Sequence, residues 1–535
     1  MLKKLIATVL ILTMALTALT ACSGTPAQSN DPGKSDPVVS NDPGSSAPEV
    51  TAGTTALGGT LKTVETFMYP SLDPVKDYYS WHSQKYGLTE SLFRLTDDIE
   101  VVPWLAEGLD IADNVATLTL KDGVCFSNGN PLTADMVKRN MLRLAENNKR
   151  FYYLNDFQLD VTDEKTLVIT MPTALPTLRN ELANPEFCMI DLDNSTDIDN
   201  NPICTGPFKV ETFVPEGDLT LVRNENYWDG DVILDSVTFY AMSDEQSKLM
   251  AMQNGEIDAY DNITATDIEI YSTDPAAYQL FSVAMQARCY MFMNPDRLDA
   301  SIREAITLVI DRETIAAFMG GVLTPTYGAF NDDTAYGKSQ QPQMNLEAAK
   351  AVMEAGGYTL NASNVYEKDG KAIPTIGLYC YAARNIDKIA VLILEQLSNF
   401  GIPCEIKLVE DPDGTYMTDP SYEFDICFYR MTTDKTGDPM PFIEGVVMSG
   451  SYQDITGYGN AEADAKIEEL RFTVDPAKRA EIANDIMKDY YAANVFVSLL
   501  CYNRNIVMAT GVSNFSEANP YEYYGVTHKT TPATK

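Results

Sequence analysis

Histidine is nearly absent from this 535-residue sequence, and so are the short motifs of common catalytic sites. Only His82 and His528 occur, which leaves little material for a Cys/His zinc site or a histidine-based triad. The sequence contains no G-x-S-x-G elbow, no P-loop, no G-x-G-x-x-G loop and no H-E-x-x-H pair. A glycosidase-like pair stays open among the 76 Asp and Glu residues, although nothing singles one out. We therefore expect no enzyme activity, no cofactor and no metal site.

Positive charge is also scarce. The 39 Lys and Arg residues leave a formal net charge of −37. A phosphate backbone would be repelled by such a chain, which excludes nucleic acid as a partner. The acidity says less about a small ligand, because surface charge also keeps a protein soluble.

Long apolar runs are missing after residue 22, and the one before it is short. Residues 1–21 predict a signal peptide, with a basic start and an apolar stretch at 5–19 that falls short of the roughly 20 residues of a membrane span. The ending Leu19-Thr-Ala-Cys22 resembles a bacterial lipobox. We expect Cys22 to carry lipid and to hold the chain on the extracytoplasmic side of the cell membrane. The alternative is an ordinary secretory signal, cleaved after Ala18.

Residues 22–56 contain almost nothing to bury. Ser, Gly, Pro, Asp, Asn and Thr dominate this segment, a composition typical of a disordered tether. The remaining chain of roughly 480 residues is too long for one hydrophobic core, so two or three lobes are expected.

No cysteine pair of the C-x-x-C type occurs. Eight cysteines follow Cys22, and most lie in apolar runs, which favours buried free thiols over a disulfide framework. They are Cys125, Cys188, Cys204, Cys289, Cys380, Cys404, Cys427 and Cys501.

Strand-like and helix-like segments alternate along the body. Thr133 is a predicted N-cap for a helix to about residue 147, and Asn345 for a helix over 346–355. A third helix begins at 385 or 386 and stops at Gly401, and Asp475 precedes a fourth with proline in its first turn. This alternation predicts an α/β protein whose sheets are covered on both faces.

An acidic run at 191–199 superficially matches a calcium-binding loop. Thr196 stands where the turn of such a loop needs glycine, and Pro202 where a bidentate glutamate belongs. We interpret the run as a solvated acidic loop.

Four motifs, in order, resemble the solute-binding proteins of ABC importers known as family 5, which bind dipeptides, oligopeptides or nickel. They are Thr205-Gly-Pro-Phe-Lys209, Val222-Arg-Asn-Glu-Asn-Tyr-Trp228, Asn254-Gly-Glu-Ile-Asp258 and Ala305–Ile315. The resemblance implies a bilobal periplasmic-binding-protein-like fold of type II, cluster C, with an extra subdomain on the first lobe. It also implies a receptor, expected to be monomeric, that delivers a small ligand to an ABC permease and its ATPase.

The resemblance also suggests how the chain divides. Lobe I would comprise residues 57–101, 204–288 and 496–535, and its extra subdomain residues 102–203. Lobe II would comprise residues 289–495.

Within the family, the nickel-binding branch is the nearer match, through Val102-Pro-Trp104, Cys125–Gly129 and Val222–Trp228. This chain departs from that branch at three places. Cys188 replaces a cleft arginine, the loop 431–439 is one residue longer, and the metal-binding histidine is missing. Positions matching the family cleft are Asp77, Tyr78, His82, Arg150, Tyr153, Cys188, Arg430, Thr432 and Asp434.

These departures favour a short peptide over nickel. Peptide binders of the family pair the ligand's ammonium with an aspartate of this loop, which implies Asp434 here, whereas Arg150 beside aromatics suits a carboxylate. The alternative is that Asp434 caps a turn. A nickel or metal-chelate ligand, or a trap that signals to a membrane kinase, are the alternatives.

Overall fold

The computed structural model describes residues 57–66, 68–76, 79–419, 421–451 and 453–534. The predicted signal peptide, Cys22, the tether, Asp77 and Tyr78 lie outside the described residues.

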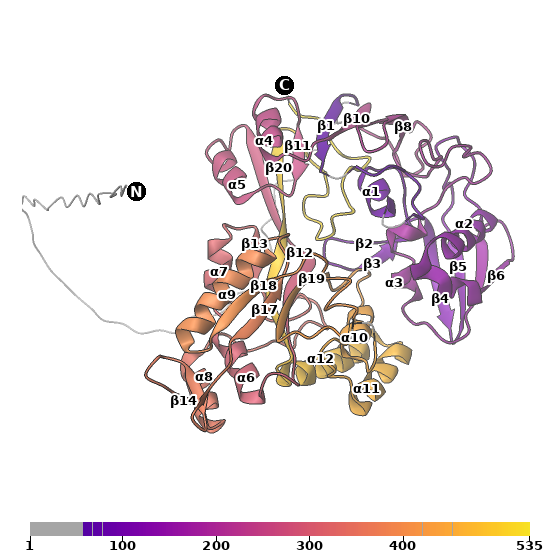
Figure 1. The fold of residues 1–535 in the computed structure, drawn as a ribbon. Helices are drawn as coiled ribbons and strands as arrows, with labels where there is room; N and C mark the ends of the chain where they lie inside the picture. Colours follow the sequence, from indigo (N-terminus) through magenta and orange to yellow (C-terminus); the bar gives the residue numbers. More distant parts are fainter. Residues whose placement is uncertain (1–56, 67, 77–78, 420, 452, 535) are drawn as a thin grey trace, which may run out of the picture. The chain divides into compact units, whose positions relative to one another are not determined.

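One mixed sheet of 11 strands forms the centre of the fold (Figure 1). Its strands, from one edge to the other, are β18 (Cys404–Leu408), β17 (Ile376–Cys380), β19 (Ile426–Thr432), β12 (Tyr278–Met293), β20 (Phe496–Ala509), β11 (Ala259–Asp261), β1 (Thr60–Glu65), β10 (Ser236–Ala241), β9 (Leu219–Arg223) and β8 (Phe208–Phe213), with β13 (Leu323–Pro325) also paired to β20. We call the part around β1 and β8–β11 lobe I, and the part around β17–β19 lobe II.

The two longest strands connect the lobes. β12 and β20 pair antiparallel from Tyr278 opposite Ala509 to Phe292 opposite Phe496, so both run through lobe I and lobe II. Their register shifts between Ala284 and Arg288, where β12 bulges. Because these strands belong to both lobes, no single residue marks a boundary, and the division proposed from the sequence stays a prediction.

Lobe II covers its part of the sheet on both faces. Along β12, Cys289 and Met291 face one core, whereas Tyr290 and Phe292 face another, as the two-residue period of a strand requires. The first core is closed by α6 (Ala300–Val309), α7 (Arg312–Phe318), α8 (Leu346–Ala355) and α9 (Ile386–Phe400), and the second by α10 (Met440–Val447), α11 (Ala461–Phe472) and α12 (Pro476–Ala492). This arrangement confirms the α/β class.

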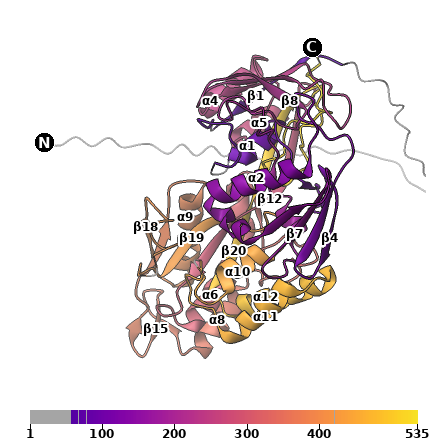
Figure 2. The same ribbon diagram turned by 90° about the vertical axis from the view of Figure 1, so that its right-hand side faces the viewer.

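A smaller antiparallel sheet carries the helix that Thr133 begins. Its order is β4 (Ala106–Ala112), β5 (Val115–Leu120), β7 (Thr166–Thr170) and β6 (Gln158–Val161), and α2 (Ala134–Asn147) packs on it (Figure 2). Val137 and Met141 of α2 meet Leu118 and Ile169 in its core.

The remaining elements are short. They are α1 (Tyr79–Lys85), α3 (Leu178–Glu181), α4 (Glu245–Gln253), α5 (Ala265–Ser272), β2 (Phe93–Leu95), β3 (Val101–Pro103), β14 (Thr359–Leu360), β15 (Tyr366–Lys368), β16 (Lys371–Ala372) and the 3₁₀ turns η1 (Lys149–Asp156) and η2 (Pro185–Phe187).

The predicted helix caps are confirmed. Thr133 accepts a hydrogen bond from the Met136 amide at 3.2 Å, and Asn345 accepts one from Ala348 at 3.0 Å. Asp475 does the same for Lys478 at 2.7 Å. All eight body cysteines are free thiols, as expected.

The acidic run is not fully solvated, and that prediction was wrong for Asp191. Its carboxylate is buried and accepts hydrogen bonds from the side-chain amides of Asn128, Asn130 and Asn194 at 2.8–3.0 Å. These amide donors take the place of water, so Asp191 holds the acidic run against Asn128 and Asn130.

Among the described residues, no helix is long and apolar enough to cross a membrane.

Candidate ligand cleft

A cleft with a volume of about 1850 Å³ lies between the lobes. Lobe I lines it with the ends of β1 and α1, parts of α4 and α5, and the C-terminal segment. Lobe II lines it with the ends of α7 and α9, with β18 and β19, and with the loop that follows β19.

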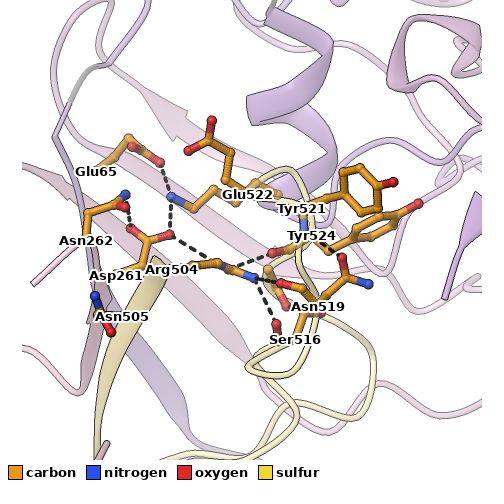
Figure 3. A network of polar contacts seen from close by, with 12 residues as sticks. Glu65, Asp261, Asn262, Arg504, Asn505, Ser516, Asn519, Tyr521, Glu522 and Tyr524 are labelled. Atoms are coloured by element: carbon orange, nitrogen blue, oxygen red, sulfur yellow. Dashed lines mark hydrogen bonds and ion pairs between the residues drawn. The ribbon is translucent and has the colours of Figure 1, made fainter. Parts of the chain in front are cut away.

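A network of buried charges borders the lobe I side of the cleft, where Glu65 and Lys85 belong to the lining, and we call this network the cleft floor (Figure 3). The Lys85 ammonium lies 3.0 Å from a carboxylate oxygen of Glu65 and 3.0 Å from one of Asp261. Arg504 Nε lies 3.7 Å from the same oxygen of Asp261. Two cations thus face two anions, at the ends of β1, α1 and β11 and within β20. No net charge is left in this buried set.

The ion pairs outweigh the effect of burial on Glu65. Burial alone would raise the pKa of this carboxyl, but Lys85 and then His82 lower it to about 2. The pKa of Lys85 is raised because Asp261 and Glu65 together exceed the opposing effect of burial. Both groups are therefore charged at neutral pH.

Arg504 also holds the C-terminal segment against the cleft. Its guanidinium donates to the carbonyl oxygens of Ser516 at 2.9 Å, Asn519 at 3.3 Å and Tyr524 at 2.8 Å (Figure 3). The segment so fixed brings Glu522 and Tyr523 to the cleft wall.

Three of the residues predicted from the sequence line this cleft: His82, Arg430 and Thr432. His82 Nδ1 lies 3.7 Å from Glu65 Oε2, and its ring meets Tyr69 edge-on at 4.4 Å between centroids. Arg430 Nη2 lies 3.7 Å from Glu522 Oε1, and its guanidinium carbon lies 5.5 Å from the ring centre of Tyr502.

Asp434 lies beneath the cleft surface instead of in its lining. The side chain is buried, accepts a hydrogen bond from the Gly437 amide at 2.6 Å, and accepts another from the Tyr336 hydroxyl. Burial raises its pKa to about 6, in spite of these two donors. In this arrangement Asp434 caps the turn 434–437.

Arg150, Tyr153 and Cys188 are also outside the cleft lining. Arg150 Nη2 donates to Glu186 Oε1 at 3.1 Å, and the indole of cleft-lining Trp81 donates to the same oxygen at 3.3 Å. Tyr153 donates to Glu181 at 3.3 Å.

Cys188 is buried in a bridge opposite Ser91, and burial raises the pKa of its thiol to about 12. Of the three residues, Arg150 is linked to the cleft lining, through the Glu186 oxygen that it shares with Trp81.

Sequence reasoning missed several cleft residues. Arg384 and Asn385 have positive φ angles of 55° and 61° and lie in the lining just before α9. Glu522 and Tyr523 also lie there. The aromatic run Tyr521-Glu522-Tyr523-Tyr524 was a usable signal near the C-terminus, whereas nothing local marked Arg384.

No group of three or more His, Cys, Asp and Glu side chains suited to a metal ion occurs within the described part of the chain.

A two-lobed α/β protein with two shared strands and a charged cleft between the lobes has the design of a solute-binding protein. Residues 100–454 match the family model of bacterial extracellular solute-binding proteins, family 5 Middle, and the chain belongs to this family. Its members are receptors that bind small ligands and work with ABC permeases.

Related proteins agree with this assignment. The chain is 27% identical to the nickel-binding protein NikA of Staphylococcus aureus, over 84% of this chain and 89% of the relative. It is 23% identical to the dipeptide-binding protein DppE of Bacillus subtilis, over 74% of this chain and 77% of the relative. The crystal structure of a nickel ABC transporter from Bacillus halodurans matches with a TM-score of 0.79 and 26% identity, covering 89% of this chain and all of that one (100%). The bilobal fold expected from the sequence is thereby confirmed.

Proposed function

We propose that this protein captures a short peptide, or a similar zwitterion, outside the cytoplasm and delivers it to an ABC importer. Family membership supports the receptor role, and the resemblance of the N-terminus to a lipobox supports a lipid anchor at Cys22. The observation that carries the choice of ligand is a loose ion pair across the cleft, between Arg430 of lobe II and Glu522 of the C-terminal segment.

At 3.7 Å the two groups are too far apart for a hydrogen bond, and each faces the same cleft. A zwitterion placed between them offers an ammonium to Glu522 and a carboxylate to Arg430. Both new contacts would be charge-assisted hydrogen bonds, which are shorter and stronger than the loose pair they replace.

Arg384 provides a second cation for the carboxylate. Its side chain is exposed in the cleft lining, and its guanidinium makes no hydrogen bond or ion pair among the described residues. Asp434 and Arg150, the pair proposed from the sequence, already hold Tyr336 and Glu186. We therefore assign the direct contacts to Glu522, Arg430 and Arg384, and place Asp434 and Arg150 behind them.

Binding then favours closure of the lobes. A ligand that touches both lobes binds the closed form more tightly, and only this difference in affinity shifts the equilibrium. β12 and β20 are the strands about which the lobes would move, because they belong to both.

A metal chelate is the second candidate. Relatives named as nickel-binding favour it, and one of the similar solved structures, NikA of S. aureus, holds nickel with two L-histidine ligands. His82 in the cleft lining is the one described imidazole that could meet such a ligand. A sensor that signals to a membrane kinase would use the same cleft. It differs from a transport receptor in the membrane protein that it contacts.

The test is calorimetric titration of di- to pentapeptides into the wild type, after a screen by thermal shift. Breaking one partner of a desolvated charge contact costs about 2–5 kcal/mol, so Glu522→Gln and Arg384→Gln should each weaken a peptide hit by about 30-fold or more. Lys350→Gln, which removes an exposed surface cation, is the matched control and should leave the affinity unchanged.

The outcomes separate the candidates. Asp434→Asn and Arg150→Gln should weaken binding as strongly only if Asp434 holds the ligand's ammonium and Arg150 its carboxylate, as the sequence suggested. If no peptide stabilises the wild type while nickel with L-histidine does, and His82→Ala removes that binding, the peptide proposal is wrong and the chelate replaces it.

A further inference from the structure

Three large apolar side chains of lobe II are exposed within the ligand cleft. Phe318 at the end of α7 is 73% exposed, Leu408 at the end of β18 is 66% exposed, and Val391 in α9 is 53% exposed. They come from three separate elements and all line the same cleft. We call Phe318, Val391 and Leu408 the apolar wall.

The fold of lobe II does not need these side chains. α9 already buries Ile389, Ile393 and Leu397 against the sheet, and Val391 stands outside that buried set. β18 is an edge strand of the sheet, and Leu408 is its last residue. Apolar residues kept exposed on several elements of one cleft are typical of a binding surface.

We propose that the apolar wall binds an apolar side chain of the ligand, next to the group that holds its carboxylate. This inference rests on the peptide function proposed above and names the class of peptide. Arg384 immediately precedes α9, and Lys388 in its first turn also lines the cleft. Val391 lies three residues beyond Lys388, so at 1.5 Å per residue about 5 Å of helix separates them.

That spacing matches one amino-acid residue. The distance from a carboxylate to the tip of its own leucine or phenylalanine side chain is of the same order, so the two contacts suit a single C-terminal residue. The preferred ligand is therefore a peptide whose C-terminal residue is apolar.

The position of the wall favours the ligand over a protein partner as its occupant. A Cβ atom added at Gly320, two residues after Phe318, would lie 2.7 Å from the Cβ of Ala265 at the start of α5. The end of α7 thus touches lobe I beside the wall. Thr264, Ala265 and Thr266 of lobe I line the same cleft, so a ligand on the wall is also within the space that closure encloses.

The test compares Ala-Leu with Ala-Asn, which has a polar side chain of similar size, and with Leu-Ala, which moves the apolar group away from the carboxylate. Wild-type protein should bind Ala-Leu at least about 10-fold more tightly than either, because moving a leucine side chain out of water onto the wall stabilises the complex. The variant Val391→Thr with Leu408→Asn should abolish most of this preference and leave the affinity for Ala-Asn within about twofold. Both positions are exposed, so melting temperature without ligand should not fall.

Val474→Thr is the matched control, since Val474 is 71% exposed and does not line the cleft. Equal affinity for Ala-Leu and Ala-Asn in the wild type overturns the inference and leaves the peptide function standing. A second outcome also overturns it: the wild type is a dimer by size-exclusion chromatography and the double variant is a monomer. The wall would then be an interface between copies of this chain. Failure of every peptide to bind overturns both proposals.

Discussion

Tyr523 of the C-terminal segment donates a hydrogen bond to the main-chain carbonyl oxygen of Lys435 in lobe II, at 3.0 Å. Asn180 of α3 does the same for the next carbonyl oxygen, that of Thr436, at 2.8 Å. The loop between them continues to Gly437, whose φ is +70° and where an added Cβ would lie 3.0 Å from the carbonyl oxygen of Ile99. The loop 433–438 is thus a further connection between the lobes, besides the strands β12 and β20.

Removing both donors should loosen this connection. The variant Tyr523→Phe with Asn180→Ala loses two hydrogen bonds worth about 0.5–1.5 kcal/mol each. We expect a larger radius of gyration without ligand by small-angle X-ray scattering, because lobe I no longer holds the loop. Weaker ligand binding should accompany the change, because closure starts from a wider opening.

Tyr416→Phe is the control for this prediction. Tyr416 also donates to a carbonyl oxygen, that of Phe428 at 2.8 Å, but both residues belong to lobe II. It should lower stability by the contribution of one hydrogen bond instead of two, and it should leave the radius of gyration unchanged. An unchanged radius in the double variant as well would show that the loop does not connect the lobes in solution.

Local patterns in the sequence predicted the parts of this fold that depend on neighbouring residues. Helix caps such as Thr133 and Asp475 act within one turn, so their signal is local. Tyr227 and Trp228, which end one of the family motifs, donate to the buried carboxyl group of Glu90 at 2.7 and 2.8 Å. The resemblance to family 5 added the bilobal fold, which periodicity alone does not give.

The cleft itself was harder to predict because its walls meet only in the folded chain. Glu522 and Arg430 lie 92 positions apart, and no period or motif links them. Asp434 was placed in the cleft by its position in the loop, yet the turn it caps and Tyr336 from a distant segment hold it below the surface. Tertiary contacts of this kind decide which polar residue of a loop meets the ligand.

The buried charges of the cleft floor should be sensitive to loss of their central cation. Lys85→Met leaves Glu65 and Asp261 buried with too little positive charge, and unpaired buried charges of this kind cost about 3–5 kcal/mol. Urea unfolding should show this loss. Adding Glu65→Gln should restore much of it, because Arg504 and Asp261 then remain as one balanced buried pair.

Lys209→Met is the matched control, since Lys209 pairs with Glu225 at the surface. Exposed pairs contribute about 0–1 kcal/mol, so this variant should be close to wild type. If Lys85→Met is equally mild, the network does not stabilise the fold.

The anchor proposed at Cys22 is tested in cells. Cys22→Ser should release the protein from the membrane fraction, because the serine hydroxyl cannot take the thioether-linked lipid. Peptide affinity and melting temperature of the released protein should match those of the wild type. Continued retention of the variant in the membrane fraction would contradict a lipid anchor at this residue.

Asp434 should make stability depend on pH in the direction opposite to that of an ion-paired carboxylate. Burial raises its folded-state pKa to about 6, Asp438 acts in the same direction, and Tyr336, Gly437 and Arg288 act against it. An unfolded aspartate has a pKa of about 3.9. Between these values the folded chain keeps a proton that the unfolded chain has lost, so this group adds stability as pH falls from about 6 to about 4.

Asp434→Asn removes that contribution because an amide does not titrate. The difference in unfolding free energy between wild type and variant, measured in urea from pH 4 to pH 8, should therefore change by roughly 3 kcal/mol, the equivalent of about two pKa units. The wild type should gain relative to the variant toward pH 4, and the difference should be constant above pH 7. Other carboxylates, including Glu65 with its lowered pKa, cancel in this difference. Parallel pH profiles for the two proteins would mean that Asp434 is solvated in the folded state, and it would then be available to a ligand ammonium after all.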